Sequence, residues 1–221
     1  MQKTGHFLRS AAAKEASLIE RKLRTPENRH ELSLAEDGLE ECARAACSVL
    51  RAGGLVAGPT DTVYGIFSAW SSAAALRRVY ALKGRHQEKR LPALAADREM
   101  LLPWVSETPP EALACLWPGA LTLVLPARDH PFGWETIAFR VPDHAFLRLL
   151  AGSLAEPVYA PSANPQGSPP ARNCDEAWAY FDEAIDLYID GGEAPDTQAS
   201  TLVSCVTHPP EVLRQGAVRI P

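Results

Sequence analysis

The sequence predicts an α/β (α+β) fold in which one mixed, twisted β-sheet is flanked by helices. Amphipathic helical stretches alternate with short apolar strands along most of the chain. Several strands are separated by too few residues for a crossover helix, which indicates antiparallel pairs beside parallel ones. The 221 residues are 46% hydrophobic, which suffices for the core of one large domain or two small ones.

The first 36 residues are expected to form a separate N-terminal extension, helical or disordered, ahead of a domain spanning residues 37–221. The extension is basic and partly helical in pattern, as organelle-targeting peptides are. Its acidic residues Glu15, Glu20 and Glu27 count against that interpretation, although targeting stays open.

The elements of the domain follow from periodicity and from turn residues. Asp37 is expected to cap a helix that ends at Gly53–Gly54, with Glu40 three residues after the cap. In the first half we then expect a strand at 55–57, helices at 72–82 and 97–105, a strand at 91–96 between them, and a further helix from Pro109. In the second half we expect strands at 120–126 and 137–141, a helix after Pro142, a strand at 157–160, a helix at 175–181, and strands at 185–190, 200–206 and 211–220.

Bulk composition excludes some classes of protein. The net charge of −5 argues against a general nucleic-acid coat. Five cysteines without a C-x-x-C pair give no disulfide or zinc framework, and they indicate reduced thiols in the cytoplasm. No apolar run is long enough to span a membrane.

Polar residues cluster at the ends of several expected strands. Thr60, Asp61, Thr62 and Tyr64 follow the first strand, in a pattern that suits either a turn or a binding site. The segment "LKGRHQEKR", from Leu82 to Arg90, suits either a solvated helix end or a cradle for phosphates, and it is not a P-loop.

Five further segments repeat this pattern, and each also has an ordinary structural explanation. They contain Thr122, Arg140, the pair Ser162 and Asn164, Ser200, and Arg214. The two prolines around "SAN" stiffen the turn, which favours positioning of a ligand. No G-x-S-x-G elbow makes Ser162 a hydrolase nucleophile.

Taken in order, these segments resemble the YrdC/TsaC-like threonylcarbamoyl-AMP synthases, in their short, single-domain form. The matching motifs are "PTDTVYG" (59–65), "KGR" (83–85), "WPGALT" (117–122), "FRVP" (139–142), "PSAN" (161–164), "DGG…ST" (190–201) and "LRQG" (213–216). The likeness covers roughly residues 37–221, and the fixed order makes it far more specific than any single motif.

The resemblance implies a YrdC-like domain with a concave basic cleft and a nucleotidyltransferase activity. L-threonine, bicarbonate and ATP would give threonylcarbamoyl-AMP and pyrophosphate, with Mg²⁺ accompanying ATP and no metal held by the protein alone. The product would pass to a transferase complex that modifies tRNA, and any tRNA binding by this chain would be weak.

The resemblance also implies roles for residues. Lys83 and Arg85 would be catalytic, by stabilising charge on the phosphates. The residues implied to meet ATP are Lys83, Arg85, Thr122, Ser162, Asn164 and Arg214. The residues implied to meet L-threonine are Thr60, Thr62, Tyr64, Arg140, Ala160 and Ser200, with the backbone of Ala160 making its contact.

The chain departs from the family pattern at Phe67, at His86 and at Leu94, and also at Pro165–Gln166 after "PSAN". These departures bear on the amino-acid half of the site, so two alternatives stay open. One is a divergent enzyme that makes a carbamoyl-adenylate from carbamoyl phosphate or another amine. The other is a non-catalytic RNA-binding module, which the acidic net charge disfavours.

Overall fold

A computed structural model describes residues 29–220 apart from 87, 131 and 196–197. Within them, ten strands form one sheet in the order β1-β8-β2-β3-β7-β4-β6-β5-β9-β10. The strands are β1 (Glu31–Ser33), β2 (Val56–Gly58), β3 (Gly65–Ala69), β4 (Ala93–Leu94), β5 (Leu121–Pro126), β6 (Thr136–Arg140), β7 (Val158–Tyr159), β8 (Leu187–Asp190), β9 (Thr201–Ser204) and β10 (Glu211–Arg214).

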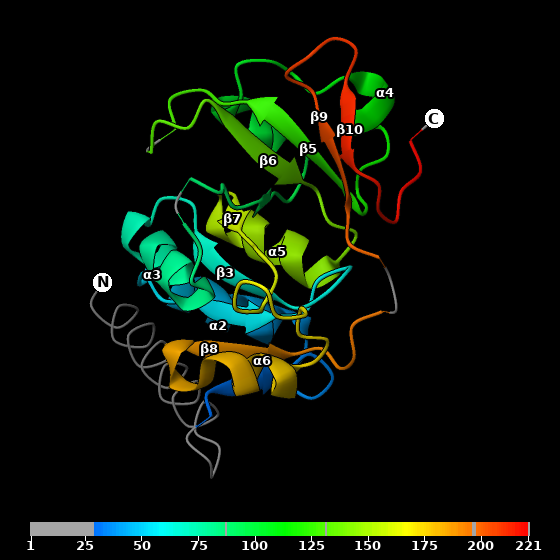
Figure 1. Ribbon diagram of the computed structural model, residues 1–221. Helices are drawn as coiled ribbons and strands as arrows, with labels where there is room; N and C mark the ends of the chain where they lie inside the picture. Colours follow the sequence, from blue (N-terminus) through cyan, green and yellow to red (C-terminus); the bar gives the residue numbers. More distant parts are fainter. Residues whose placement is uncertain (1–28, 87, 131, 196–197, 221) are drawn as a thin grey trace, which may run out of the picture.

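Five α-helices and two short 3₁₀ helices accompany the described strands. They are α2 (Leu39–Arg51), α3 (Ala73–Lys83), η1 (Glu99–Trp104), α4 (Glu111–Ala114), α5 (Ala145–Leu154), α6 (Cys174–Phe181) and η2 (Asp182–Ala184). Figure 1 shows β5, β6, β9 and β10 in one part of the molecule, and α2, α3, α5 and α6 gathered in the other.

The sheet is mixed, as the sequence predicts. β1–β8, β2–β8, β4–β6 and β5–β9 are parallel, whereas β2–β3, β3–β7, β4–β7, β5–β6 and β9–β10 are antiparallel. The antiparallel pairs β2–β3 and β9–β10 join strands that are neighbours in sequence, so they need no crossover helix.

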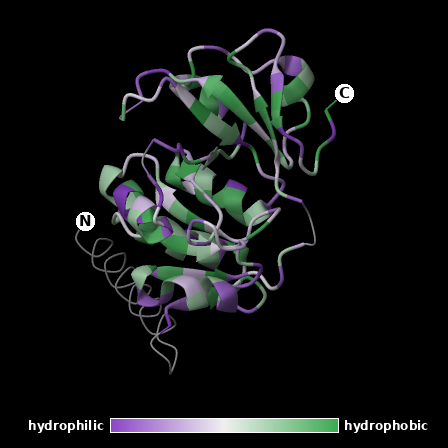
Figure 2. Cartoon of the chain, viewed as in Figure 1, coloured by the Kyte–Doolittle hydropathy of each residue, from purple (hydrophilic) through white to green (hydrophobic). Residues whose placement is uncertain are grey.

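Two apolar clusters cover the two faces of the sheet. One contains Tyr64, Ile66, Phe139 and Tyr159, and the other contains Phe67, Leu94 and Val158 together with the buried faces of α2 and α5. Neighbouring residues of one strand fall into different clusters because side chains alternate along a strand. Figure 2 shows the apolar residues concentrated on the strands and on the inner sides of the helices.

Helices α2 and α5 do not shield the whole of their face. In β5, β6 and β9 the side chains on the face opposite α2 and α5 are buried. On the face of α2 and α5, side chains such as Val124, Ala138 and Leu202 are only partly buried. This leaves one side of that half of the sheet accessible, and Arg140 and Thr122 are among the residues on that side.

Three local expectations differ from the structure. Gly38, not Asp37, is the N-cap residue of α2, and it makes no side-chain cap; the Asp37 carboxylate instead accepts a hydrogen bond from Ser33 N at 3.0 Å. Strands β1 and β3 are not among the expected elements, because β1 precedes the expected boundary and β3 directly follows a polar loop. The boundary at residue 36 stays a prediction, and residues 1–28 of the expected extension lie outside the described residues.

Candidate functional site

The segment 59–64 folds into a loop that its own hydroxyl groups hold. Thr60 Oγ1 donates to Val63 O at 2.7 Å and accepts from Thr62 N at 3.0 Å and Val63 N at 3.2 Å. Thr60 and Thr62 are both buried, and their hydroxyl oxygens lie 3.0 Å apart. The segment therefore forms a turn, as its residue types favour. Most of the hydrogen-bonding capacity of the Thr60 hydroxyl is used within this turn.

Asp61, at the centre of this loop, pairs with Arg140 at the end of β6. Asp61 Oδ1 lies 3.1 Å from Arg140 Nη1, and both side chains are 8% exposed. Thr62 Oγ1 accepts from the same Nη1 at 3.3 Å, and Asp61 Oδ2 accepts from Asp143 N at 3.2 Å. Burial lowers the pKa of Arg140, the Asp61 carboxylate opposes this shift, and the charge of Arg214 adds to it.

A chain of hydroxyl groups and a cation lies beside Arg140. Thr122 Oγ1 and Ser200 Oγ are 2.8 Å apart. The Arg214 guanidinium donates to Ser200 O through Nη2 at 2.8 Å and through Nε at 3.2 Å. We call Asp61, Thr62, Arg140, Thr122, Ser200 and Arg214 the Arg140 group.

Gly216 explains how Arg214 reaches Ser200. A Cβ atom at position 216 would lie 2.1 Å from Ala199 O and 2.6 Å from Thr201 N, which no packing allows. The Thr201 hydroxyl accepts from Gly216 N at 2.9 Å and so fastens the same stretch. The glycine of the "LRQG" motif thus lets two backbone segments lie in direct contact.

A second polar cluster surrounds Lys83 at the end of α3. Lys83 Nζ donates to Ser162 O at 2.5 Å, Asn164 O at 2.7 Å and Asn164 Oδ1 at 3.1 Å. Ser162 Oγ donates to the same Asn164 Oδ1 at 2.6 Å, and Asn164 Nδ2 donates to Ser168 O at 2.5 Å. We call Lys83, Arg85, Ser162 and Asn164 the Lys83 group.

Lys83 is 3% exposed, and all three of its partners in this cluster are neutral oxygens. Burial, and then the nearby charge of Arg85, lower the pKa of Lys83 to about 8. Arg85 itself donates to Lys89 O at 3.1 Å and to Arg90 O at 3.2 Å. The hydrogen-bond acceptors of these two cations carry no formal charge. The positive charge of the region is therefore not neutralised, and the region suits an anionic ligand.

Arg140 and Ser162 lie on the sheet face that α2 and α5 partly cover, whereas Lys83 reaches Ser162 O from the end of α3, whose apolar residues pack in the cluster on the other face. Arg140 is aligned with Leu94, and Leu94 with Val158, so the three side chains share a face. Ser162 forms an isolated bridge with Gly65, which puts it on that face as well. The loop 59–64 joins the groups, since it carries Asp61 and ends at Gly65.

Two residues implied to meet threonine use polar groups in hydrogen bonds within the protein. Tyr64 is fully buried, and its hydroxyl donates to Gly192 O at 2.7 Å and accepts from Gly191 N at 3.0 Å. Ala160 N donates to Pro92 O at 2.9 Å, which leaves only its carbonyl oxygen for a ligand. The threonine-binding roles of both stay predictions.

The residues that depart from the family pattern differ in their burial and in their distance from the site. Phe67 is fully buried in the cluster beneath α2 and α5, and its ring lies 2.9 Å from the position of a Cβ on Gly65. Leu94 is aligned with Arg140 and so lies next to the Arg140 group. His86 is exposed. Phe67 therefore supports the loop from below, while Leu94 can affect the site directly.

The sequence motifs assign no role to Asp61. A signal was available, because an arginine expected inside an apolar strand requires an anionic partner if it is buried. Asp61, one residue past the expected Thr60 contact, is that partner.

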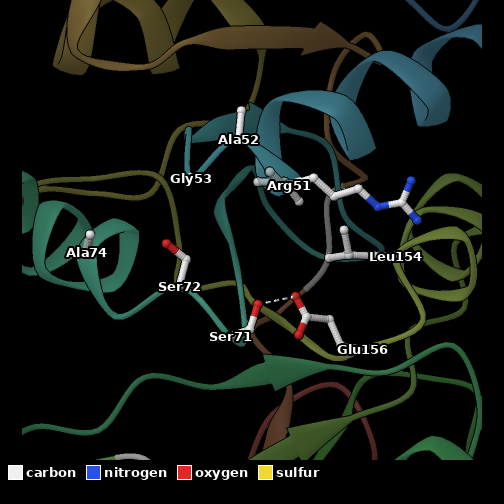
Figure 3. Close-up of a pocket in the computed structure, with 9 residues that line it drawn as sticks. Arg51, Ala52, Gly53, Ser71, Ser72, Ala74, Leu154 and Glu156 are labelled. Atoms are coloured by element: carbon white, nitrogen blue, oxygen red, sulfur yellow. Dashed lines mark hydrogen bonds between the residues drawn. The ribbon is translucent and has the colours of Figure 1, made fainter.

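A pocket of about 610 Å³ lies away from both groups, between the ends of α2 and α5 and the start of α3. Figure 3 shows its polar lining, with Ser71 hydrogen-bonded to Glu156 and with Arg51 and Ser72 at its sides. None of the residues implied by the motifs lines it.

Two features of the described residues bear on the class of site. No group of three His, Cys, Asp or Glu side chains there could hold a metal ion. No described helix has the length and apolar character needed to cross a bilayer. The fold and the site thus define an α/β domain whose cations and hydroxyls suit small anionic ligands.

Comparison with known proteins names the family. The Sua5/yciO/yrdC family, described as "Telomere recombination", matches residues 48–216. A threonylcarbamoyl-AMP synthase from Bacillus subtilis is 34% identical over 182 residues, which are 78% of this chain and 53% of the relative. One from Halorhodospira halophila is 35% identical over 156 residues, which are 67% of this chain and 82% of the relative. The chain belongs to the Sua5/yciO/yrdC family.

A solved structure agrees with this assignment. The crystal structure of Pyrococcus abyssi Sua5 complexed with L-threonine matches with a TM-score of 0.72 and 36% identity, over 79% of this chain and 54% of that one. The chain spans about half the length of the Bacillus and Pyrococcus relatives that it matches.

Proposed function

We propose that this chain is an L-threonylcarbamoyladenylate synthase, a nucleotidyltransferase that uses L-threonine, bicarbonate and ATP. The observation that carries the proposal is that the loop 59–64 links two polar groups. Its Asp61 pairs with Arg140, and it leads into Gly65, which is bridged to Ser162 beside Lys83. One group offers cations among neutral acceptors, and the other offers an anchored arginine. The names of the relatives and the threonine complex of a family member support the same activity.

The reaction brings anions together. The threonine amine and bicarbonate form a carbamate with loss of water, and a carbamate oxygen attacks the α-phosphorus of ATP. The bond from that phosphorus to the bridging oxygen breaks, and pyrophosphate leaves. Because both reactants are negative, the protein must supply fixed positive charge where charge develops on the phosphoryl oxygens.

The Lys83 group fits the phosphates in this proposal. Lys83 and Arg85 provide the positive charge, and Ser162 and Asn164 orient phosphate oxygens. All three N–H donors of Lys83 are engaged in this structure, so direct contact requires exchange of the longest bond, to Asn164 Oδ1 at 3.1 Å. Thr122 and Arg214 complete the ATP site, and no side chain forms a covalent intermediate.

The members of the Arg140 group other than Thr122 and Arg214 fit the amino acid. Arg140 pairs with the threonine carboxylate through its planar fork. Thr60, Thr62, Tyr64, Ser200 and Ala160 remain the other residues proposed around the substrate. Since Thr60 and Tyr64 use their hydroxyls within the protein, their contribution is to shape the loop.

Mg²⁺ has no protein site of its own in this proposal. The described residues offer no cluster of three ligands, and Mg²⁺ commonly binds through substrate phosphates with only one or two carboxylates. We therefore assign no step to the ion. The product is proposed to pass, in the cytoplasm, to a transferase complex that modifies tRNA.

One assay tests the proposed function. The purified protein is incubated with ATP, bicarbonate and each amino acid in turn, and the adenylate is identified by mass. We expect threonylcarbamoyl-AMP and pyrophosphate with threonine alone. Pyrophosphate release that requires carbamoyl phosphate, or another amine, would establish the alternative enzyme. Tight RNA binding at physiological salt without any adenylate would establish the RNA-binding module.

A further inference from the structure

The Asp61–Arg140 pair is built so that only one end of the guanidinium is occupied. Asp61 Oδ1 and Thr62 Oγ1 both meet Nη1, at 3.1 Å and 3.3 Å. Within the described part of the chain, no hydrogen-bond acceptor pairs with Nε or Nη2 of Arg140. Those two nitrogens form the edge that binds a carboxylate in a bidentate manner.

Asp61 is held through one carboxylate oxygen and through the closed loop that carries it. Its Oδ2 accepts from Asp143 N, in the turn between β6 and α5, while the loop around it is closed by the Thr60 hydroxyl. The carboxylate therefore cannot rotate freely, and it fixes Arg140 relative to both the loop and the turn. A residue that meets no substrate can in this way set the direction of one that does.

The charges around the pair make this arrangement necessary. Arg140 is buried, and Arg214 lies near enough to act on it as a like charge. An unpaired buried cation would be costly and would move toward water. With Asp61 in place the cation stays buried, and its free edge keeps a single direction.

We propose that Asp61 is a positioning residue that aims the free edge of Arg140 at the carboxylate of the amino-acid substrate. The inference rests on the proposed function, because it takes that substrate to be L-threonine. It predicts that Asp61 governs how strongly the protein distinguishes a carboxylate from a carboxamide.

The test measures equilibrium binding by calorimetry to the full-length chain, with L-threonine, L-threoninamide and ATP as separate ligands. In Asp61→Asn we expect the Kd for threonine to rise about tenfold or more, because the arginine loses its charged anchor. The Kd values for threoninamide and ATP should change less than about threefold, so the preference for threonine collapses. Asp61→Glu, which keeps the carboxylate, should restore most of this preference.

Two further variants keep the result interpretable. Glu111→Gln removes the same charge from the exposed pair with Arg98 and should leave all three Kd values unchanged. If Asp61→Asn does not fold, Thr62→Val removes the other acceptor at Nη1, and the preference for threonine should fall about threefold.

The outcomes separate this inference from the proposed function. Parallel weakening of threonine, threoninamide and ATP, or an unchanged preference in a folded variant, overturns the positioning role while leaving the function in place. A wild-type protein that binds ATP but not threonine overturns both.

Discussion

Lys83 and Arg140 are both buried cations at the ends of secondary-structure elements, yet the protein holds them in opposite ways. Lys83 lies among three neutral oxygens, whereas Arg140 is paired with a carboxylate. Burial lowers the pKa of each, but at Arg140 Asp61 opposes the shift, and at Lys83 the charge of Arg85 deepens it.

This difference shows how one site can divide charge stabilisation and ligand orientation between two cations. A cation with neutral partners keeps its full field for an incoming polyanion. A cation paired with a carboxylate contributes little net field, but it has a fixed direction and a fork that reads a planar anion. The Lys83 group is therefore suited to charge stabilisation and the Arg140 group to orientation.

Removing the Lys83 charge should have the largest effect on activity of the changes considered for the two groups. We expect Lys83→Ala to lower threonine-dependent pyrophosphate release at least about 100-fold, because a preorganised charge is lost at the phosphates. Pyrophosphate release at saturating substrates measures the effect. Lys89→Ala, which removes an exposed lysine from the following segment, should remain within about twofold. Turnover of folded Lys83→Ala at the wild-type rate would remove its proposed role.

Gly216→Ala should disrupt the Arg140 group without touching a ligand. A Cβ there would lie 2.1 Å from Ala199 O, so the segment must move, at a cost of about 1–3 kcal/mol of stability or more. Arg214 would then leave Ser200, and the KM for ATP should rise about tenfold. In Gly152→Ala, in α5, the new Cβ would make only an ordinary contact, 3.8 Å from Ala96 Cβ. This variant should instead raise the free energy of unfolding by about 0.5–1 kcal/mol. Urea titrations and KM values that ranked these variants in reverse would contradict the packing argument.

The pH dependence of activity should distinguish the two cations. Lys83 has a pKa of about 8 in the folded chain, so kcat/KM for ATP should fall as the pH rises through that value. Arginine does not titrate in this range, so Lys83→Arg should lack this alkaline limb even if it is slower. A limb that persists in Lys83→Arg would assign the titration to another group.

The same shift has a consequence for stability. The folded pKa of Lys83, about 8, lies below its ordinary value of 10.5, so folding disfavours the charged form. Its contribution to stability is therefore fully present above pH 10.5 and is lost as the pH falls through about 8. Lys83→Met should remove this increase in stability between those two values.

Tyr64→Phe should have the smallest effect on activity. The variant loses the hydroxyl that holds Gly191 N and Gly192 O, at a cost of about 1–3 kcal/mol of stability. The KM for threonine should stay within about twofold. A large rise in this KM with unchanged stability would instead support the direct substrate contact that the sequence implies for Tyr64.

The sequence predicts the mixed sheet and most of its elements because hydrophobic periodicity depends on local spacing. It does not predict β1 or β3. Strand β1 is three residues long and forms only by pairing with β8, which lies about 155 residues further along the chain. Strand β3, "GIFSA", is buried on both faces, so it lacks the alternation that marks a half-buried strand.

The ordered motifs locate the residues of the site, but not what each side chain contacts. Nothing in "KGR" indicates that Lys83 uses all three donors on the "SAN" turn. Likewise "PTDTVYG" does not reveal that Tyr64 is bound to "DGG" at the end of β8. Both contacts join segments far apart in sequence, which only the folded chain brings together.

The contact between Gly65 and Phe67 restricts the order in which these positions can change over evolution. A methyl group at 65 would meet the Phe67 ring at 2.9 Å, while its next neighbours, Pro161 O at 3.3 Å and Thr60 Cγ2 at 3.4 Å, need give only slightly. A lineage that first shortened the side chain at 67 could later accept alanine at 65. A lineage that made the two replacements in the opposite order would pass through a damaged loop.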